Sequence, residues 1–153
     1  MTDQAPPLEF LMAVSAEVGD LVNMGAAPLG ERRVVYITGG TFAGPRLRGA
    51  VLAGADWQIA RRDGALELDA RYALKEERGG VIQVISQGMR HGPPEVLARL
   101  ARGEAVDPAS YFFRTFMRFE TGAPQLAFLN TTMALATAVR HARRVELKCY
   151  KVL

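Results

Sequence analysis

The sequence predicts a mainly β protein, an antiparallel β-barrel of about nine strands with one short inserted helix. Two observations support this prediction. Runs of alternating apolar and polar residues recur along the chain, and turn signals rich in glycine, proline, asparagine or aspartate separate them. The pattern also lacks strand–helix–strand alternation, so successive strands form an antiparallel meander. Closing the meander into a barrel removes its exposed edges, and a two-sheet sandwich is the alternative.

The first half of the chain supplies six predicted strands. The longest covers Leu8–Val18, where alternation with a period of two indicates one buried face. Gly19–Glu31 carries Gly, Pro and Asn and is interpreted as an irregular connection. Gly39-Gly40 marks a turn or bulge, because glycine accepts positive φ freely. The other strands are predicted at Arg33–Thr38, Leu47–Leu52, Asp56–Arg62, Leu66–Lys75 and Val81–Met89, with Asp63-Gly64 as the clearest hairpin turn.

One helix interrupts the strands in the second half. Pro93-Pro94 precedes the segment EVLARLARGE, in which Leu97 and Leu100 share one face and Gly103 ends the helix. This helix is expected to plug one end of the barrel, or else to act as a lid. Gln125–Asn130 is ambiguous between a helical turn and the start of a strand. The closing strands are predicted at Tyr111–Glu120, Thr131–Arg140 and Val145–Leu153.

Composition indicates one globular domain over residues 1–153. Hydrophobic residues make up 49% of the chain and charged residues 23%, which is unlike a disordered protein. The formal charge is +3, and its basic part comes from 16 arginines and 3 lysines scattered along the sequence. A nucleic-acid-binding protein usually concentrates such charge on one face or helix, so no nucleic-acid partner is expected.

Several other functional classes lack their signatures. The first residues, MTDQAPPLEF, do not form a secretory signal, and no apolar run reaches the ~20 residues of a membrane span. A cytoplasmic protein without a membrane partner is therefore expected. Cys149 is the only cysteine and lies in a strand-like run, where we expect a buried inert thiol. His91 and His141 are the only histidines, and nucleotide-binding motifs are absent, so no metal and no cofactor are expected.

Charged side chains inside the predicted strands are the candidates for a site. Asp69 and Arg71 lie two apart, hence on one face of a strand, and Arg114 and Glu120 share a face of another. In a barrel that holds a ligand, arginine can grip a carboxylate or polarise a carbonyl, and a desolvated carboxylate can act as a general base. The alternative is a solvent-facing surface with ordinary ion pairs. Further candidates are Arg48, Asp56 and Arg90 at strand ends, and Tyr36, Tyr72 and Tyr111 as proton donors.

One stretch, Gly39–Gln58, is expected to form a wall of the ligand pocket. It joins short predicted strands by tight turns and holds five of the 15 glycines and the only tryptophan. The polar groups of such a stretch are set among small residues, which leaves room for a ligand beside them.

Seven segments of the chain occur in the order found in a known family. They are ITGGTFAGPRLRG (Ile37–Gly49), GADWQ (Gly54–Gln58), LDARYAL (Leu68–Leu74), HGPPEVLARLARGEAVDP (His91–Pro108), YFFRT (Tyr111–Thr115), RFETGAP (Arg118–Pro124) and LN (Leu129–Asn130). With them, the chain resembles the uncharacterised bacterial and fungal proteins called domain of unknown function 3237, or uncharacterised protein family 0311. The resemblance runs from about Leu8 to Leu153. One departure is Leu126-Ala127-Phe128, where family members often carry two aromatic residues flanking a small one.

The resemblance implies an antiparallel barrel of the lipocalin or allene-oxide-cyclase type, often oligomeric, without a defining metal or nucleotide. It implies no particular reaction. The family's motif positions that fit a polar pocket in this chain are Arg48, Asp56, Trp57, Asp69, Arg71, Arg90, Tyr111, Arg114, Glu120 and Asn130.

Two functions follow from these residues. The first is a cofactor-independent isomerase, cyclase, lyase or hydrolase that acts on a hydrophobic or aromatic carbonyl compound. In that enzyme Asp69 or Glu120 is the base, Tyr111 the acid, and Arg71 or Arg114 the oxyanion or carboxylate partner. The ligand-binding residues are then Arg48, Asp56, Trp57, Arg90 and Asn130. The second is a non-catalytic ligand-binding or carrier barrel, and a weaker third is an oligomeric scaffold. A small-molecule ligand and a homo-oligomer are expected.

Overall fold

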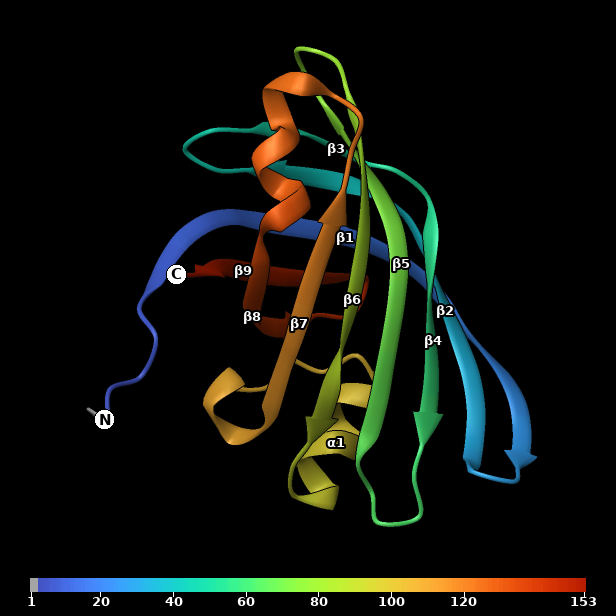
Figure 1. The fold of residues 1–153 in the computed structure, drawn as a ribbon. Coiled ribbons are helices and arrows are strands. Elements are labelled where there is room, and N and C mark those ends of the chain that lie inside the picture. Colours follow the sequence, from blue (N-terminus) through green and yellow to red (C-terminus); the bar gives the residue numbers. More distant parts are fainter. Residues whose placement is uncertain (1–2) are drawn as a thin grey trace.

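Nine antiparallel strands close into a barrel in the computed structural model, which describes residues 3–153 (Figure 1). β1 pairs with both β9 and β2, and this double pairing completes the ring. The predicted antiparallel barrel is confirmed. The strands are β1 (Leu8–Ala27), β2 (Gly30–Ala43), β3 (Arg48–Val51), β4 (Gly54–Ala60), β5 (Leu66–Glu76), β6 (Val81–His91), β7 (Phe112–Glu120), β8 (Met133–Arg140) and β9 (Arg144–Val152).

Strands β3 and β4 together occupy one position in the ring, between β2 and β5. β3 pairs with one end of each neighbour, and β4 pairs with the other end. At Gly54, where β4 begins, a Cβ atom would lie 2.2 Å from the carbonyl oxygen of Arg71, so only glycine allows this close approach. The start of β4, just after the break between the two strands, therefore requires glycine.

The first hairpin is longer than the sequence indicates. Gly19–Glu31, predicted as an irregular connection, instead continues β1 as far as Ala27 and starts β2 at Gly30. Register shifts along the β1–β2 pairing absorb the residues that suggested a loop, and Gly25 takes a φ of 83°. The prediction was wrong because bulges let glycine and asparagine remain within a strand. A bulge also lies at Thr38, directly before Gly39, because Gly39 pairs with Glu17 but Ile37 pairs with Val18.

The helical segments lie at opposite ends of the barrel (Figure 1). The predicted helix is α1 (Pro94–Ala101), which buries Leu100 under one end. The ambiguous segment is a 3-10 helix, η2 (Pro124–Thr131), at the other end, and a single 3-10 turn, η1 (Pro108–Ser110), precedes β7. Within residues 3–153, no helix is long and apolar enough to cross a membrane.

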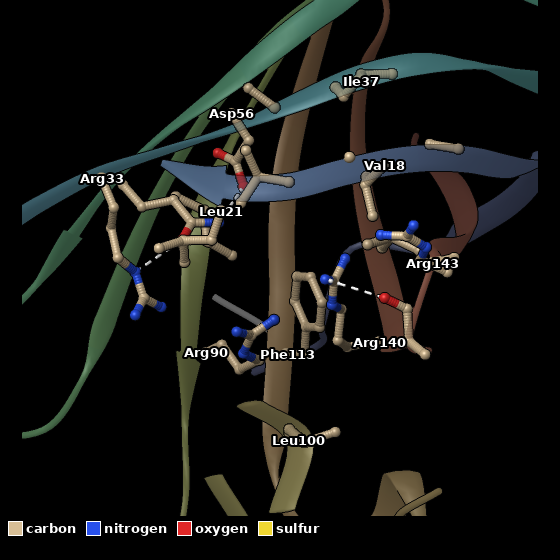
Figure 2. Close-up of a pocket in the computed structure, with 18 of the residues that line it drawn as sticks. Val18, Leu21, Arg33, Ile37, Asp56, Arg90, Leu100, Phe113, Arg140 and Arg143 are labelled. Atoms are coloured by element: carbon tan, nitrogen blue, oxygen red, sulfur yellow. Dashed lines mark hydrogen bonds between the residues drawn. The ribbon is translucent and has the colours of Figure 1, made fainter. Parts of the chain in front are cut away.

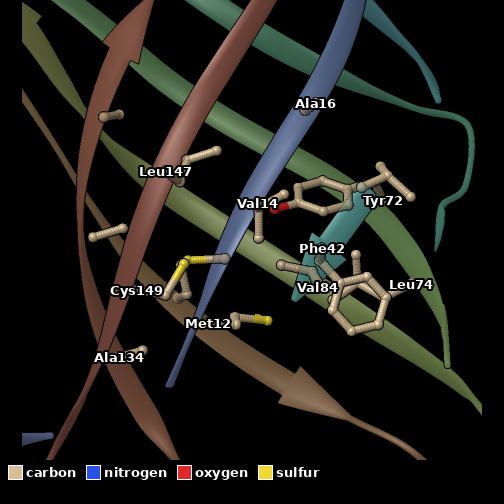
Figure 3. Packing of buried hydrophobic residues seen from close by; sticks show 14 of the residues in the cluster. Met12, Val14, Ala16, Phe42, Tyr72, Leu74, Val84, Ala134, Leu147 and Cys149 are labelled. Carbon is tan, nitrogen blue, oxygen red and sulfur yellow. The ribbon is translucent and has the colours of Figure 1, made fainter. Parts of the chain in front are cut away.

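Close packing fills the η2 end of the interior. Met12, Leu74 and Ile82 from the strands are fully buried there, as are Leu126 and Leu129 of η2, and Figure 3 shows the strand residues around Val14 and Phe42.

Cys149 belongs to the same cluster, with its Sγ 3.3 Å from the Met117 sulfur. Burial raises the pKa of the Cys149 thiol to about 12, so it remains protonated at neutral pH. The expected buried, inert thiol is therefore what the structure contains.

Candidate functional site

A cavity of about 410 Å³ occupies the α1 end of the barrel interior. Inward-facing side chains of β1, β2 and β4 to β9 form its wall, and Leu100 of α1 lies beneath it (Figure 2). At the rim, Arg143 Nη1 lies 2.8 Å from Asp20 Oδ1, which joins the β8–β9 turn to β1. A cavity of this size accommodates a small organic molecule.

Asp56 supplies the carboxylate in the interior of this cavity. It lies on β4, where alternation points Asp56 and Gln58 inward and Trp57 outward. One carboxylate oxygen accepts a hydrogen bond from Gln58 Nε2 at 2.8 Å, and the other accepts the backbone N–H of Asp69 at 3.0 Å. Burial raises the pKa of Asp56 to about 6, because these hydrogen bonds and the charge of Arg90 offset only part of the desolvation. The group therefore exchanges protons near neutral pH.

Three arginines reach into the cavity around Asp56. Arg33 of β2, Arg90 of β6 and Arg140 of β8 come from separate strands, and in Figure 2 their guanidinium groups lie between Asp56 and Leu100 of α1. Arg33 Nε donates to Gln58 Oε1 at 3.1 Å, so the Gln58 amide bridges an arginine and the carboxylate. Burial, followed by the charges of Arg140 and Arg33, lowers the pKa of Arg90 to about 10, which still leaves it protonated at neutral pH.

Hydroxyl groups line the part of the cavity nearer the packed core. Tyr72, Ser86 and Thr115 are buried and belong to the cavity wall. In the described part of the chain, neither the Tyr72 hydroxyl nor the Thr115 hydroxyl has a hydrogen-bond partner. Buried polar groups without partners are uncommon in proteins, so these two mark a place where another molecule can bind. Among residues 3–153, no three His, Cys, Asp or Glu side chains gather as a metal site needs.

Two of the ten sequence-predicted positions, Asp56 and Arg90, line the cavity. Both had been assigned to ligand binding. Asp56 also supports the expectation that the segment Gly39–Gln58 forms part of a pocket wall.

The four charged side chains that were predicted to be catalytic do not line the cavity. Asp69 and Arg71 of β5, and Arg114 and Glu120 of β7, are on the outer face of the barrel and do not line the cavity. Asp69 and Arg71 form an ion pair with Oδ1 and Nε 3.8 Å apart, and their side chains are 43% and 58% exposed. The prediction of an inward orientation was wrong, because alternation defines two faces of a strand without identifying the interior one.

Tyr111 and Asn130 hold the backbone near the ends of β7 and β8. The buried Tyr111 hydroxyl accepts the backbone N–H of Arg140 at 3.0 Å, so Tyr111 positions a residue of the cavity wall without lining the cavity itself. Asn130 accepts the N–H of Thr121 at 2.8 Å and donates to its carbonyl at 3.0 Å, which fixes η2 against the end of β7.

Arg48, Trp57 and Tyr36 lie on the surface. Arg48 Nε is 3.4 Å from Glu77 Oε1, and both side chains are largely exposed. Trp57 and Tyr36 point outward and are 46% and 49% exposed. None of the three lines the cavity.

Sequence reasoning missed Arg33, Gln58 and Arg140. A usable signal exists for the two arginines, because each shares a strand face with buried apolar residues. Arg33 is in phase with Val35 and Ile37, which are buried. A polar residue that falls on the apolar face of a strand is a better indicator of a cavity than one on the charged face.

Comparison with known proteins identifies the family of this chain. The model of the family described as "Protein of unknown function (DUF3237)" matches residues 6–152. The chain belongs to this family. Within the family, it is 41% identical over 151 residues to the UPF0311 protein RPA1785 of Rhodopseudomonas palustris, covering 97% of this chain and 99% of that one. The crystal structure of RPA1785, described as a conserved protein of unknown function, superposes with a TM-score of 0.95 and covers 98% of this chain and 99% of that chain.

Two further solved structures share the barrel. A protein of Acinetobacter baumannii described as β-barrel-like is 38% identical, with a TM-score of 0.84, and covers 99% of this DUF3237 chain and 100% of that chain. A protein described as an enzyme from Penicillium herquei is 20% identical, with a TM-score of 0.76 over 100% of this chain and 98% of that chain. At that identity the likeness shows the shared fold alone.

Proposed function

We propose that this protein is a cofactor-independent enzyme that acts by general acid–base chemistry on a small hydrophobic or aromatic carbonyl compound. The observation that carries the proposal is Asp56, a carboxylate with a pKa raised to about 6 by burial, inside a cavity that also contains three arginines. A group with this pKa accepts a proton readily at neutral pH and returns it readily. Asp56 therefore takes the role of base that the sequence had suggested for Asp69 or Glu120.

The cavity matches the needs of proton abstraction next to a carbonyl. The Asp56 carboxylate removes a proton from the carbon beside the carbonyl group, and the negative charge that develops on the carbonyl oxygen is stabilised by positive charge and hydrogen-bond donors. The hydroxyls of Tyr72, Ser86 and Thr115 supply the donors, and the field of Arg33, Arg90 and Arg140 supplies the positive charge, which the low-dielectric surroundings strengthen. The protonated Asp56 then returns the proton, to the same carbon or to another atom. Isomerisation, cyclisation and retro-aldol cleavage share this first step.

The description of the structurally similar Penicillium herquei protein as an enzyme is compatible with catalysis on this fold. The same cavity also suits the alternative function, a ligand-binding or carrier barrel, because an arginine-lined pocket holds an acidic ligand without any reaction. The observation in favour of this alternative is that Arg90 has no protein acceptor among the described residues, as an anion-binding group would before its ligand arrives.

A turnover screen separates these functions. Wild-type protein, Asp56→Asn and the matched outer-face control Asp69→Asn are incubated with a panel of aromatic ketones, lactones and hydroxy acids, and products are followed by mass spectrometry and NMR. We expect Asp56→Asn to reduce turnover by roughly 10²–10⁴-fold, the usual contribution of a general base, while Asp69→Asn retains it. Ligand-dependent thermal stabilisation without turnover contradicts the enzyme and supports the carrier. Equal turnover by all three proteins contradicts Asp56 as the base.

The expected setting of this activity is the cytoplasm, in a homo-oligomer without nucleic-acid or membrane partners. Support for self-association comes from the outer face of the barrel, where Phe116 of β7 and Met133 of β8 are 64% and 58% exposed. Sedimentation equilibrium tests it, and a monomer at all concentrations contradicts it.

A further inference from the structure

Arg90 places a guanidinium group in the cavity without a hydrogen-bonded partner among the described residues. Its guanidinium makes no hydrogen bond or ion pair with any residue in the range 3–153, and its nearest aromatic neighbour is the Phe113 ring, 5.4 Å away. Arg140 faces the same space, and among the described residues its guanidinium makes a single long hydrogen bond of 3.5 Å, to the Ala142 carbonyl. A guanidinium carries five N–H donors, and leaving them unpaired inside a protein is costly. The arrangement therefore suits an anionic group of the ligand.

The unpartnered hydroxyls form a second polar region at a different depth. Ser86 lies four residues from Arg90 on β6, which is about 13 Å along the strand. Its inward neighbours on the adjoining strands are diagonal in register: Tyr72 pairs with Val84, and Thr115 pairs with Gly88. The three hydroxyls thus follow one diagonal row across β5, β6 and β7. The Tyr72 and Thr115 side chains are more than nine-tenths buried and unpaired within the described residues.

Asp56 is in register with the middle hydroxyl of this row. It pairs with Ala70 of β5, which in turn pairs with Ser86 of β6, and it also interacts electrostatically with Arg90. Apolar residues make up much of the remaining cavity wall, among them Leu68, Ala70, Phe113 and Leu147. The cavity therefore combines the guanidinium groups of Arg90 and Arg140, an apolar wall, and a base in register with a row of hydroxyl groups.

From this layout we infer that the substrate is an apolar oxo-carboxylate, whose carboxylate binds Arg90 and Arg140 and whose ketone carbonyl lies between Asp56 and the hydroxyls of Tyr72, Ser86 and Thr115. This inference rests on the proposed function for the role of Asp56. The hydroxyls donate to the carbonyl oxygen as Asp56 removes a proton from the adjacent carbon, so the carbon–hydrogen electron pair moves into an enolate held by hydrogen bonds. Reversal of the transfer restores the ketone, and no other reactant is consumed.

Three matched probes test the ligand class. γ-Benzoylbutyrate carries both the ketone and the carboxylate, its methyl ester lacks the charge, and δ-phenylvalerate lacks the ketone. Binding is measured by isothermal titration calorimetry, with saturation-transfer NMR for weak ligands. We expect wild-type protein to bind γ-benzoylbutyrate at least tenfold more tightly than either of the other probes. Equal binding of the ester, or no detectable binding of any probe at millimolar concentration, overturns the inference.

Variants assign each end of the probe. Arg90→Met is expected to weaken γ-benzoylbutyrate binding about tenfold or more, because one charge-assisted contact is lost. The affinity for the methyl ester should not change. Arg71→Met, at an exposed position, is the control. Thr115→Val and Tyr72→Phe are expected to weaken the binding of γ-benzoylbutyrate but not the binding of δ-phenylvalerate. If Arg90→Met affects acid and ester alike, the carboxylate assignment is wrong. Circular dichroism confirms that each variant is folded.

Hydrogen–deuterium exchange at the carbon beside the ketone separates this inference from the proposed function. NMR in D₂O is expected to show exchange on γ-benzoylbutyrate with wild-type protein and none with Asp56→Asn. Tight, charge-dependent binding without exchange supports the ligand class and contradicts Asp56 as base, whereas exchange on the ester at an equal rate supports the base and contradicts the carboxylate site.

Discussion

Asp56 and Asp69 are the same chemical group on adjacent strands, and the structure gives them opposite surroundings. They are connected directly, because the backbone N–H of Asp69 donates to the Asp56 carboxylate. Asp56 faces the cavity, where burial raises its pKa to about 6. The Asp69 side chain faces outward, 43% exposed, beside Arg71. The two residues lie close together on paired strands, so their different surroundings come from the face of the strand that each occupies.

The strongest way to test this contrast is the pH dependence of activity. Because the base must be ionised, kcat/KM of the wild-type protein is expected to fall about tenfold per pH unit below about pH 6 and to level off above it. Steady-state kinetics on any substrate found in the screen measures the profile, and Asp69→Asn should retain its shape. A profile that is flat between pH 4 and pH 7, or one altered by Asp69→Asn, breaks the distinction between the two carboxylates.

Stability should respond to the same carboxyl group. Since the folded state raises the pKa of Asp56 from 3.8 to about 6, it binds the proton more tightly than the unfolded state does. The folded protein therefore loses stability as the pH rises from about 3 to about 7, by about 3 kcal/mol at this site. Urea unfolding of wild-type protein and Asp56→Asn across this range measures the difference.

Relative to the wild type, the free energy of unfolding of Asp56→Asn should increase by up to about 3 kcal/mol as the pH rises toward 7. Asp69→Asn serves as the outer-face control at every pH. If the difference in unfolding free energy between wild type and Asp56→Asn stays constant across the pH range, folding does not raise the pKa of Asp56.

Tyr111→Phe probes an inward residue that supports the cavity wall. The substitution removes the acceptor of the Arg140 N–H hydrogen bond while keeping the ring, so we expect a loss of about 1 kcal/mol in the free energy of unfolding. Chemical denaturation measures this loss. No change in stability would show that the Arg140 N–H finds another acceptor, and the wall would then not depend on Tyr111.

The smallest effect is expected on the outer face. Arg71→Ala removes an ion pair whose partners are both well exposed, and it should change the free energy of unfolding by less than about 0.5 kcal/mol. A loss several times larger, measured by the same urea titration, would mean that the outer face carries part of the structure and that the contrast between the faces is weaker than the exposures indicate.

The sequence predicted the strands well because period-two alternation reports directly on one-sided burial. β5 illustrates both its success and its limit. The apolar set from Leu66 to Leu74 and the charged set that includes Asp69 and Arg71 were separated correctly. The charged set was then assigned to the pocket, although the interior of this barrel is largely apolar. Arg33 and Arg140 escaped notice because they occur at strand ends, on faces that otherwise read as ordinary core.

Two other features lay beyond local patterns. The extension of β1 through Gly19–Ala27 depends on pairing with β2, and local composition favours a loop there. The unpaired state of the Tyr72 and Thr115 hydroxyls depends on the side chains of three different strands. Both are properties of tertiary contact, which single-sequence propensity does not encode.

The packed η2 end has a consequence for how proteins with this barrel can change. Leu126 and Leu129 of η2 are fully buried, and η2 lies at the end of the barrel opposite α1 (Figure 1). Burial of such side chains supplies about 1.5–3 kcal/mol each, which supports an α1 end that tolerates unpaired arginine and hydroxyl groups. The framework and the recognition surface are thus separate modules within one barrel. Side chains around the cavity can be exchanged, in evolution or in engineering, to accept a new ligand without rebuilding the part that makes the chain fold.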